Sequence, residues 1–232
     1  EERNHIRRMF DAIAFRYDFV NRVLSLRRDV AWRKAMTAAL PEQQNLQALD
    51  LAAGTCDVLL ALQQPGKPVA RVVGADISAA MLRCGREKIN RAGCVNSSML
   101  VQADAAALCF QDASYDVVTV AFGVRNFEDL QAGLRGMLRV LKPGGRLFVL
   151  EFSRPSWWMR PFFRLYFHGV MPLIGRLISK DSAAYTYLPA SVDAFPEGRA
   201  FETILAASGG REVRSERLTG GIATLRSEER RV

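Results

Sequence analysis

The segment between residues 115 and 152 constrains the fold of this chain more than any other. Residues 115–121 form an apolar run typical of a buried strand, and after Phe122 comes the loop Gly123-Val124-Arg125-Asn126-Phe127. Four leucines then recur at helical spacing, at Leu130, Leu134, Leu138 and Leu141. A Lys-Pro-Gly-Gly turn and a second apolar run at 146–152 complete the unit. This order predicts two parallel strands joined by a helix, and small ligands bind at the carboxyl ends of such strands. Arg125 and Asn126 are therefore candidate functional residues.

The same alternation of short apolar runs and helical patterns extends over the first two thirds of the chain. Five runs are predicted strands, namely residues 46–52, 71–75, 99–103, 115–121 and 146–152. Near the C-terminus, residues 212–218 and 222–226 flank Thr219-Gly220-Gly221, which is typical of a hairpin turn. We predict an α/β fold with a seven-stranded, mostly parallel sheet, a C-terminal antiparallel hairpin and helices on both faces.

We expect residues 1–232 to form a single domain with two additions, because no linker long enough to divide the chain is visible. Residues 1–40 are a predicted helical extension with one apolar face. That face either packs on the sheet or forms a lid over a ligand, with Phe15 and Tyr17 placed against a cationic group. Residues 154–200 are a predicted insertion, apolar with basic edges.

Acidic residues end two successive predicted strands beside a small-residue turn. The stretch from Leu49 to Asp57 contains neither G-x-G-x-x-G nor G-K-[ST], which argues against a dinucleotide and a nucleoside triphosphate. Asp76 can accept both hydroxyls of a ribose, and Asp104 can accept from an adenine amino group. With Gly54, these acids predict a nucleoside laid across three strand ends, which favours S-adenosylmethionine. The alternative is that each Asp only caps the following helix.

With these residues, the chain resembles the class I, Rossmann-like S-adenosylmethionine-dependent methyltransferases, and more narrowly the ubiquinone/menaquinone-biosynthesis C-methyltransferases. Four blocks carry the resemblance: Tyr17 to Asn21 with Ser25, Trp32 and Arg33; Gly54 to Asp57; Phe122 to Asn126 with Pro143 to Gly145 and Glu151 to Pro155; and Tyr185 to Pro189 with Phe195, Pro196 and Leu218 to Ala223. The resemblance implies cofactor contacts from Gly54, Thr55, Asp76, Ile77, Asp104, Ala105 and Ala121.

The sequence departs from the family pattern at four positions. Cys56 stands where the family usually has glycine, and Ala121 stands where a serine is frequent. Arg27 replaces a common glycine, and Asp29 replaces a common histidine. Because glycine tolerates positive φ and cysteine does not, we expect Cys56 either to take φ < 0 or to add strain of about 1–2 kcal/mol. We therefore expect weaker cofactor binding than in Cys56→Gly.

The resemblance implies methylation of a ring carbon of a prenylated hydroquinone. Demethylmenaquinol is the favoured acceptor, and the benzoquinol precursor of ubiquinone is the alternative. A free phenol has a pKa of about 10, so the site must stabilise the phenolate or supply a base. Arg125 could stabilise it, Asn126 could orient the hydroxyl, and Tyr185 could donate a hydrogen bond. The structural alternatives are an ion pair for Arg125, a helix cap for Asn126 and core packing for the tyrosines.

Charge and cysteine usage limit the other partners. The net charge is +8, but the basic residues are scattered with no run of five, so we expect no nucleic-acid partner. The four cysteines show no C-x-x-C spacing and only two histidines exist, so we expect no metal site. Isolated cysteines and a charged, leader-free opening favour a cytoplasmic protein.

Residues 154–180 combine large apolar side chains with five basic residues. Only 11 residues lie between Arg164 and Arg176, far fewer than the roughly 20 that span a bilayer. We expect an element that contacts an anionic membrane surface peripherally, at its inner face. The alternatives are a homodimer interface or a cover over the substrate pocket. An alternative hypothesis from another functional class is a membrane-surface binding protein with a degenerate methyltransferase fold.

Overall fold

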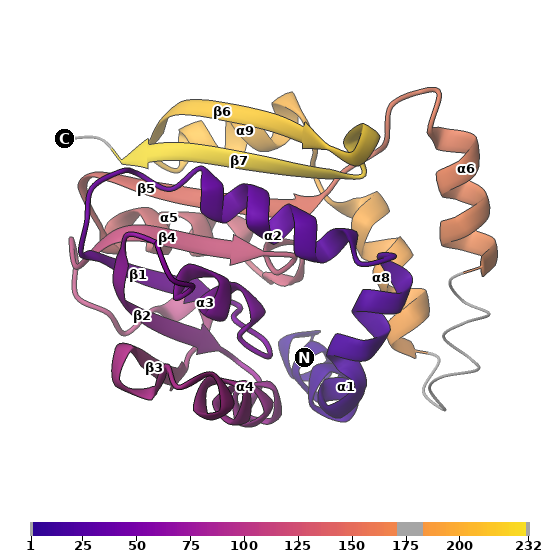
Figure 1. Cartoon of the computed structure of the whole chain (residues 1–232). Helices are drawn as coiled ribbons and strands as arrows, with labels where there is room; N and C mark the ends of the chain where they lie inside the picture. The colour runs from indigo at the N-terminus through magenta and orange to yellow at the C-terminus, as the bar shows by residue number, and fades with distance from the viewer. Residues whose placement is uncertain (1, 171–182, 231–232) are drawn as a thin grey trace.

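A computed structural model shows a central seven-stranded sheet and describes residues 2–170 and 183–230 (Figure 1). Its strands are β1 (Leu46–Leu51), β2 (Val69–Asp76), β3 (Ser98–Gln102), β4 (Tyr115–Ala121), β5 (Leu141–Phe152), β6 (Gly210–Leu218) and β7 (Ala223–Arg230). Their order is β3-β2-β1-β4-β5-β7-β6, in which β7 runs antiparallel to both β5 and β6. The predicted sheet and its terminal hairpin are confirmed.

Helices cover both faces of the sheet, and others lie beyond the strand ends. They are α1 (Glu2–Leu24), α2 (Arg28–Ala38), α3 (Asp57–Leu62), α4 (Ala79–Ala92), α5 (Leu130–Val140), α6 (Arg160–Arg164), α8 (Ala183–Ala194) and α9 (Arg199–Ala207). Short 3-10 turns occupy Val95–Ser97, Ala105–Ala107, Val124–Asn126 and Thr219–Gly221, and a π-helical turn occupies Leu165–Val170. Ser78 and Asp129 cap α4 and α5 by accepting from the Met81 and Ala132 amides.

Two apolar clusters pack against the two faces of the sheet. On one face, side chains of β1 meet Trp32 and Met36 of α2 and Leu59 of α3. On the other, Leu134 of α5 and Phe201 of α9 are fully buried against neighbouring strands. Because successive side chains of a strand point to opposite faces, the sequence of each central strand contributes to both clusters.

Strand β5 begins earlier than its apolar run suggests. Leu141 pairs with Tyr115, and the next pair joins Arg146 to Val117, so residues 142–145 form an insertion inside the strand. Gly144 supplies the positive φ of 75° that this bulge requires. The predicted strand at 146–152 therefore missed the part before the Pro-Gly-Gly segment, because the bulge looks like a strand boundary in sequence.

The N-terminal helix α1 makes its main contacts with other helices, namely α4, α2 and α8. In Figure 1 it lies across the carboxyl ends of the central strands, next to α8. Ile6, Met9 and Val20 are buried on its inner face, whereas Phe15 is 92% exposed. The predicted apolar face is thus real, but it packs on helices that surround the strand ends. Within the described residues, no helix has both the length and the apolarity to cross a membrane.

Candidate active site

Two cavities lie at the carboxyl ends of β1 and β4, and they share one wall. The larger has a volume of about 720 Å³ and the smaller about 220 Å³. Residues from α1, the two strand ends and the loop after β4 line both cavities: Phe10, Tyr17, Ala52, Gly54, Ala121 and Phe122. A ligand lying along this shared wall can therefore extend from one cavity into the other.

The smaller cavity contains the predicted nucleoside contacts. Asp76, Ile77, Asp104 and Ala105 all line it. The Asp76 carboxylate accepts the Gly54 amide at 2.8 Å through Oδ2 and the Ser78 amide at 2.8 Å through Oδ1. Burial raises the pKa of Asp76, and these two amide bonds oppose that rise by favouring the carboxylate. An ionised carboxylate retains further lone pairs, so the two amide bonds leave it able to accept more donors, and contact with ribose hydroxyls stays a prediction.

Asp104 has a structural role as well as a place at the cavity. Its Oδ1 accepts the Ala106 amide at 3.0 Å and so caps the 3-10 turn Ala105–Ala107. The capping alternative is therefore present in the structure. The cap uses one of the two carboxylate oxygens, and contact with an adenine amino group stays a prediction.

The loop between β1 and α3 leaves room for a ligand at Gly54. Gly54 has φ of 53°, and no atom lies within 4 Å of the position that a Cβ would take. Cys56 has φ of 67°, so it adopts the left-handed conformation. Of the two alternatives expected from sequence, φ < 0 or a strained positive φ, the structure has the second. Its buried thiol packs against Gly85 of α4 and lines neither cavity, so the substitution leaves the crevice open. Burial raises the pKa of Cys56 to about 12, which keeps the thiol neutral.

Aromatic side chains from three elements form one wall of the larger cavity. The ring centroids of Phe122 and Phe152 lie 4.7 Å apart. The ring centroid of Trp32 lies 5.8 Å from that of Phe122 and 6.1 Å from that of Phe152. The Trp32 indole N–H donates to the Thr219 hydroxyl at 2.8 Å, which fixes the ring against the hairpin. A flat, apolar ligand would find a complementary surface here.

Arg125 forms an ion pair, which the sequence analysis gave as the structural alternative to a catalytic role. Its Nη1 lies 2.8 Å from Oε1 of Glu151, whose side chain is fully buried, and its guanidinium carbon lies 5.5 Å from the centre of the Phe152 ring. Arg125 also lines the larger cavity, and its Nε has no hydrogen-bond partner in the described chain. The pair therefore holds a cation at the cavity wall, and a catalytic role for Arg125 stays a prediction.

Asn126 is not a helix cap, because Asp129 occupies that position at the start of α5. Instead, the Tyr187 hydroxyl donates to Asn126 Oδ1 at 2.9 Å. Asn126 lines the smaller cavity and Tyr187 the larger, so this bond bridges the two. Tyr185 belongs to the same helix α8, but its side chain lies outside the described part of the structure, so its predicted role stays a prediction.

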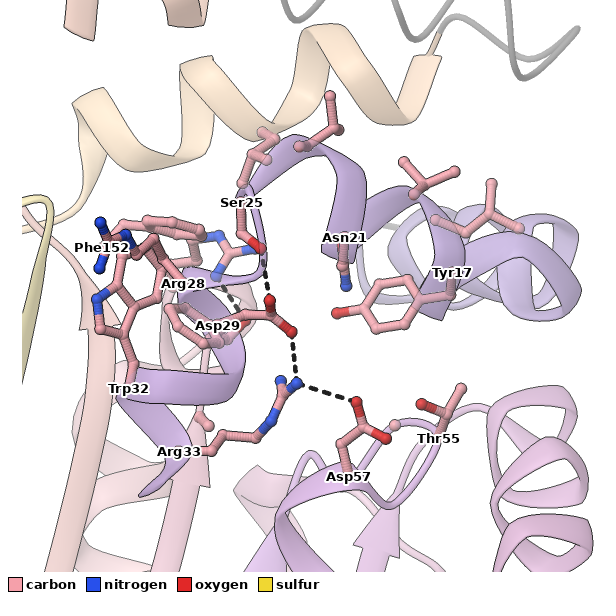
Figure 2. Close-up of a pocket in the computed structure, with 18 of the residues that line it drawn as sticks. Tyr17, Asn21, Ser25, Arg28, Asp29, Trp32, Arg33, Thr55, Asp57 and Phe152 are labelled. Carbon is pink, nitrogen blue, oxygen red and sulfur yellow. Dashed lines mark hydrogen bonds and ion pairs between the residues drawn. The ribbon is translucent and has the colours of Figure 1, made fainter. Parts of the chain in front are cut away.

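Tyr17 reaches both cavities from α1. Burial raises the pKa of its hydroxyl, and the nearby positive charge of Arg125 and a hydrogen bond to Asn21 counteract part of that rise. Figure 2 shows this hydroxyl directed toward Asn21 and Asp29. The sequence placed Tyr17 on the inner face of the helix but did not distinguish packing from ligand contact.

Sequence reasoning missed a network of charged residues between the N-terminal helices and the glycine loop. Lys88 of α4 contacts Asp18 of α1 at 2.8 Å and also pairs with Asp57, the first residue of α3. Thr55, a predicted cofactor contact, donates its hydroxyl to Asp18. Burial alone would raise the pKa of Asp57, but Lys88 and Arg33 outweigh it and hold that pKa below its ordinary value. The only local signal was the i, i+4 spacing of Asp29 and Arg33.

Comparisons with known proteins agree with this geometry. Residues 1–228 match the model of the ubiE/COQ5 methyltransferase family. The demethylmenaquinone methyltransferase of Thermus thermophilus is 44% identical over 223 residues, covering 96% of this chain and all of that protein. The ubiquinone/menaquinone biosynthesis C-methyltransferase UbiE of Geobacter sulfurreducens is 40% identical, covering 99% of this chain and 90% of that protein.

Solved structures support the fold at much lower sequence identity. A possible histamine N-methyltransferase from Thermotoga maritima superposes with a TM-score of 0.69 at 15% identity, covering 98% of this chain and all of that one. The [4+2]-cyclase SpnF superposes with a TM-score of 0.73 at 13% identity, covering 98% and 96% of the two chains. The match along residues 1–228 and the 40–44% identity of these relatives show that the chain belongs to the ubiE/COQ5 methyltransferase family, with S-adenosylmethionine as its methyl donor.

Proposed function

We propose that this chain methylates a ring carbon of a prenylated hydroquinone and that its acceptor is demethylmenaquinol. The observation that carries the proposal is the meeting of the two cavities at Gly54 and Ala121. The smaller cavity has the carboxylates that suit a nucleoside, and the larger has the volume and aromatic wall that suit a bicyclic ring. The names of several close relatives, which are demethylmenaquinone methyltransferases, favour the same acceptor.

When bound, S-adenosylmethionine supplies an electrophilic methyl group on its sulfonium. The acceptor ring becomes nucleophilic only in its reduced form, after a phenolic proton leaves. Arg125 contributes a cation at the wall of the larger cavity, and Glu151 holds that cation in place. A positive charge near a phenolic oxygen lowers the pKa of the phenol and stabilises the phenolate. Arginine stays protonated, so its role is electrostatic and the proton leaves to another acceptor.

Asn126 and Tyr187 position the acceptor next to Arg125. Because the Tyr187 hydroxyl donates to Asn126 Oδ1, the amide group of Asn126 is fixed in one orientation. Because Asn126 lines the smaller cavity, its NH₂ group can donate to a ring oxygen that reaches the junction of the two cavities. The aromatic wall of Trp32, Phe122 and Phe152 and the cover provided by α1 exclude water from the same space. Much of the rate then comes from alignment of the two reactants.

The prenyl tail needs an apolar exit, and exposed apolar side chains gather at the rim of the larger cavity. We define the rim patch as Phe15, Leu26, Trp157, Phe162 and Leu165, each at least 69% exposed. Phe15, Leu26 and Phe162 also line the cavity itself. Arg27, Arg28, Arg160 and Arg164 flank these residues in sequence. Apolar side chains among basic ones suit the surface of an anionic membrane, so we propose that the protein takes its acceptor from that surface, at the inner face of the membrane.

Methylation is tested with the purified chain, S-adenosylmethionine carrying a deuterated methyl group, and short-chain quinones reduced with dithionite. We expect mass spectrometry to find the labelled methyl on the naphthoquinol ring, and no product from the oxidised quinone. The benzoquinol precursor of ubiquinone is the comparison substrate. A larger kcat/KM with that benzoquinol would replace demethylmenaquinol as the acceptor, and methylation of neither quinol would refute the proposal.

Membrane contact is tested by co-sedimentation with liposomes that contain anionic or only neutral lipid. We expect binding to anionic liposomes that weakens as the salt concentration rises. We expect this binding to be lost in the double variant Phe162→Ser/Leu165→Ser. Val95→Ser is the matched control, because Val95 is 54% exposed and lies next to β3, at the far side of the sheet from α6 in Figure 1. A homodimer could bury the same patch. If light scattering shows a dimer that the double variant Phe162→Ser/Leu165→Ser dissociates, the partner of the patch is a second copy of the chain and not a membrane.

A further inference from the structure

Arg33 lies on a wall of the larger cavity and is held between two carboxylates. Its Nη2 pairs with Oδ2 of Asp29, one turn earlier in α2, and lies 3.1 Å from Oδ2 of Asp57 at the start of α3. Figure 2 shows Ser25, Asp29, Arg33 and Asp57 joined in a row along this wall. The side chain of Arg33 is only 13% exposed, and it lines the larger cavity.

Both carboxylates are themselves fixed, so the guanidinium has little freedom to move. Asp29 accepts the Ser25 hydroxyl at 2.5 Å, and Asp57 also pairs with Lys88. Both contacts of Arg33 use the same nitrogen. Among the described residues, its Nη1 and Nε make no hydrogen bond, although a guanidinium carries five N–H donors in a planar fork. A held cation with unused donors on a cavity wall is suited to bind an anionic group.

The position of the methyl donor determines which anionic group can reach Arg33. The adenosine half is expected in the smaller cavity, at Asp76 and Asp104, and the shared wall at Gly54 separates that cavity from the larger one. S-adenosylmethionine carries its adenosine and its amino-acid arm on opposite sides of the sulfonium. With adenosine in the smaller cavity, the arm extends past Gly54 toward Arg33 and Asp57, which line the larger cavity beside it.

We propose that Arg33 binds the carboxylate of the amino-acid arm of S-adenosylmethionine, and that Asp29 and Asp57 act as positioning residues for it. Carboxylates and cations alternate along this wall, so it also offers carboxylate oxygens to the ammonium group next to that carboxylate. The inference rests on the proposed function only through the methyl donor, not through the acceptor. The wall would thus bind both charges of the zwitterionic arm, whichever quinol is the acceptor.

Calorimetry on the full chain tests the inference with two ligands, S-adenosylmethionine and its decarboxylated analogue, which lacks only the carboxylate. We expect Arg33→Met to weaken binding of S-adenosylmethionine by about 10- to 100-fold, the range that one charge-assisted hydrogen bond supplies. Binding of the decarboxylated analogue should stay unchanged. Arg33→Lys should fall between, because it keeps the charge and loses the fork. Lys34→Met is the matched control, since it removes an exposed cation that follows Arg33 in the same helix and lines neither cavity.

Two results would overturn the assignment. Equal losses for both ligands in Arg33→Met would mean that Arg33 only supports the loop, and no loss for either would mean that it is not used. If Arg33→Met does not fold, the same calorimetry with both ligands is carried out on the wild type and on the double variant Arg33→Met/Asp29→Asn. Wild-type protein that binds the two ligands equally refutes a carboxylate contact. Wild-type protein that prefers S-adenosylmethionine but methylates no quinol leaves this inference standing and refutes the proposed acceptor.

Discussion

The contact between Cys56 and Gly85 predicts that these two residues depend on each other. A Cβ added at Gly85 would lie 3.1 Å from Cys56 Cβ, 3.3 Å from the Thr55 carbonyl carbon, and in severe overlap with Cys56 Sγ. Cys56 itself is fully buried and adopts a positive φ of 67°. The cysteine therefore fits only because α4 has no side chain at position 85.

The free energies of the two single changes follow from this geometry. Gly85→Ala should gain about 1 kcal/mol of helix propensity and lose about 1–3 kcal/mol to overpacking against the thiol, so the variant is neutral to clearly destabilised. Cys56→Gly should gain about 1–2 kcal/mol from relief of the left-handed strain. It should lose a similar amount through the buried thiol and the freedom of glycine in the unfolded chain. In the double variant the thiol and its Cβ are gone. Only the Thr55 carbonyl carbon stays close, at 3.3 Å, so the alanine keeps most of its gain in helix propensity.

Urea unfolding of the four proteins gives the coupling free energy directly. We expect Gly85→Ala to be neutral to destabilising in the wild type and stabilising in Cys56→Gly, with a coupling of about 1–3 kcal/mol and unchanged m-values. Effects that add within about 0.5 kcal/mol would refute the reasoning. Calorimetry on the same proteins tests the further prediction that Cys56→Gly binds S-adenosylmethionine more tightly than the wild type.

Three other changes test the site. Glu151→Gln should destabilise the fold by about 3–5 kcal/mol by leaving Arg125 buried without its carboxylate, whereas Arg125→Met/Glu151→Gln should recover stability in thermal melts but not methyl transfer. Tyr187→Phe should lower kcat severalfold at unchanged affinity for the methyl donor, because Asn126 loses its orienting bond; a fall in both would indicate a general loss of structure. Burial raises the pKa of Asp50 to about 7 from 3.8, so the native carboxyl holds its proton more tightly than the unfolded one and stability should fall as pH rises through that window. Asp50→Asn should remove about 3 kcal/mol of that decline between pH 5 and 8 in urea titrations, and an unchanged decline would contradict the raised pKa.

The sheet and its ligand-binding edge could be predicted from sequence because both depend on local patterns. Apolar runs of strand length, a leucine spacing of three to four, and acids directly after the runs are each visible within about ten residues. Asp76 and Asp104 reach the same cavity because parallel strands bring their carboxyl ends to one edge. The start of β5 was missed because the bulge at residues 142–145 interrupts the local pattern without ending the strand.

Partners of the site residues could not be predicted in the same way, because they are distant in sequence. Glu151 lies 26 residues after Arg125, and Tyr187 lies 61 residues after Asn126. A glutamate inside the apolar run of β5 could have signalled that a buried cation faces it, since an unpaired buried carboxylate is costly. Which cation it faces depends on the path of the loop after β4, and nothing in the sequence states that path.

Thr55 is an example of how local and distant contributions combine at this site. Its place beside Gly54 follows from the turn after β1, which the sequence predicted. Its hydroxyl, however, is bonded to Asp18 of α1 and lies 3.2 Å from Lys88 of α4, so three separate elements meet at one predicted cofactor contact. Because a ligand that reaches Thr55 must share or replace these bonds, binding at the glycine loop and the position of α1 are energetically linked. The sequence predicted that this helix either packs on the sheet or forms a lid over a ligand, and these bonds connect it to the methyl-donor site.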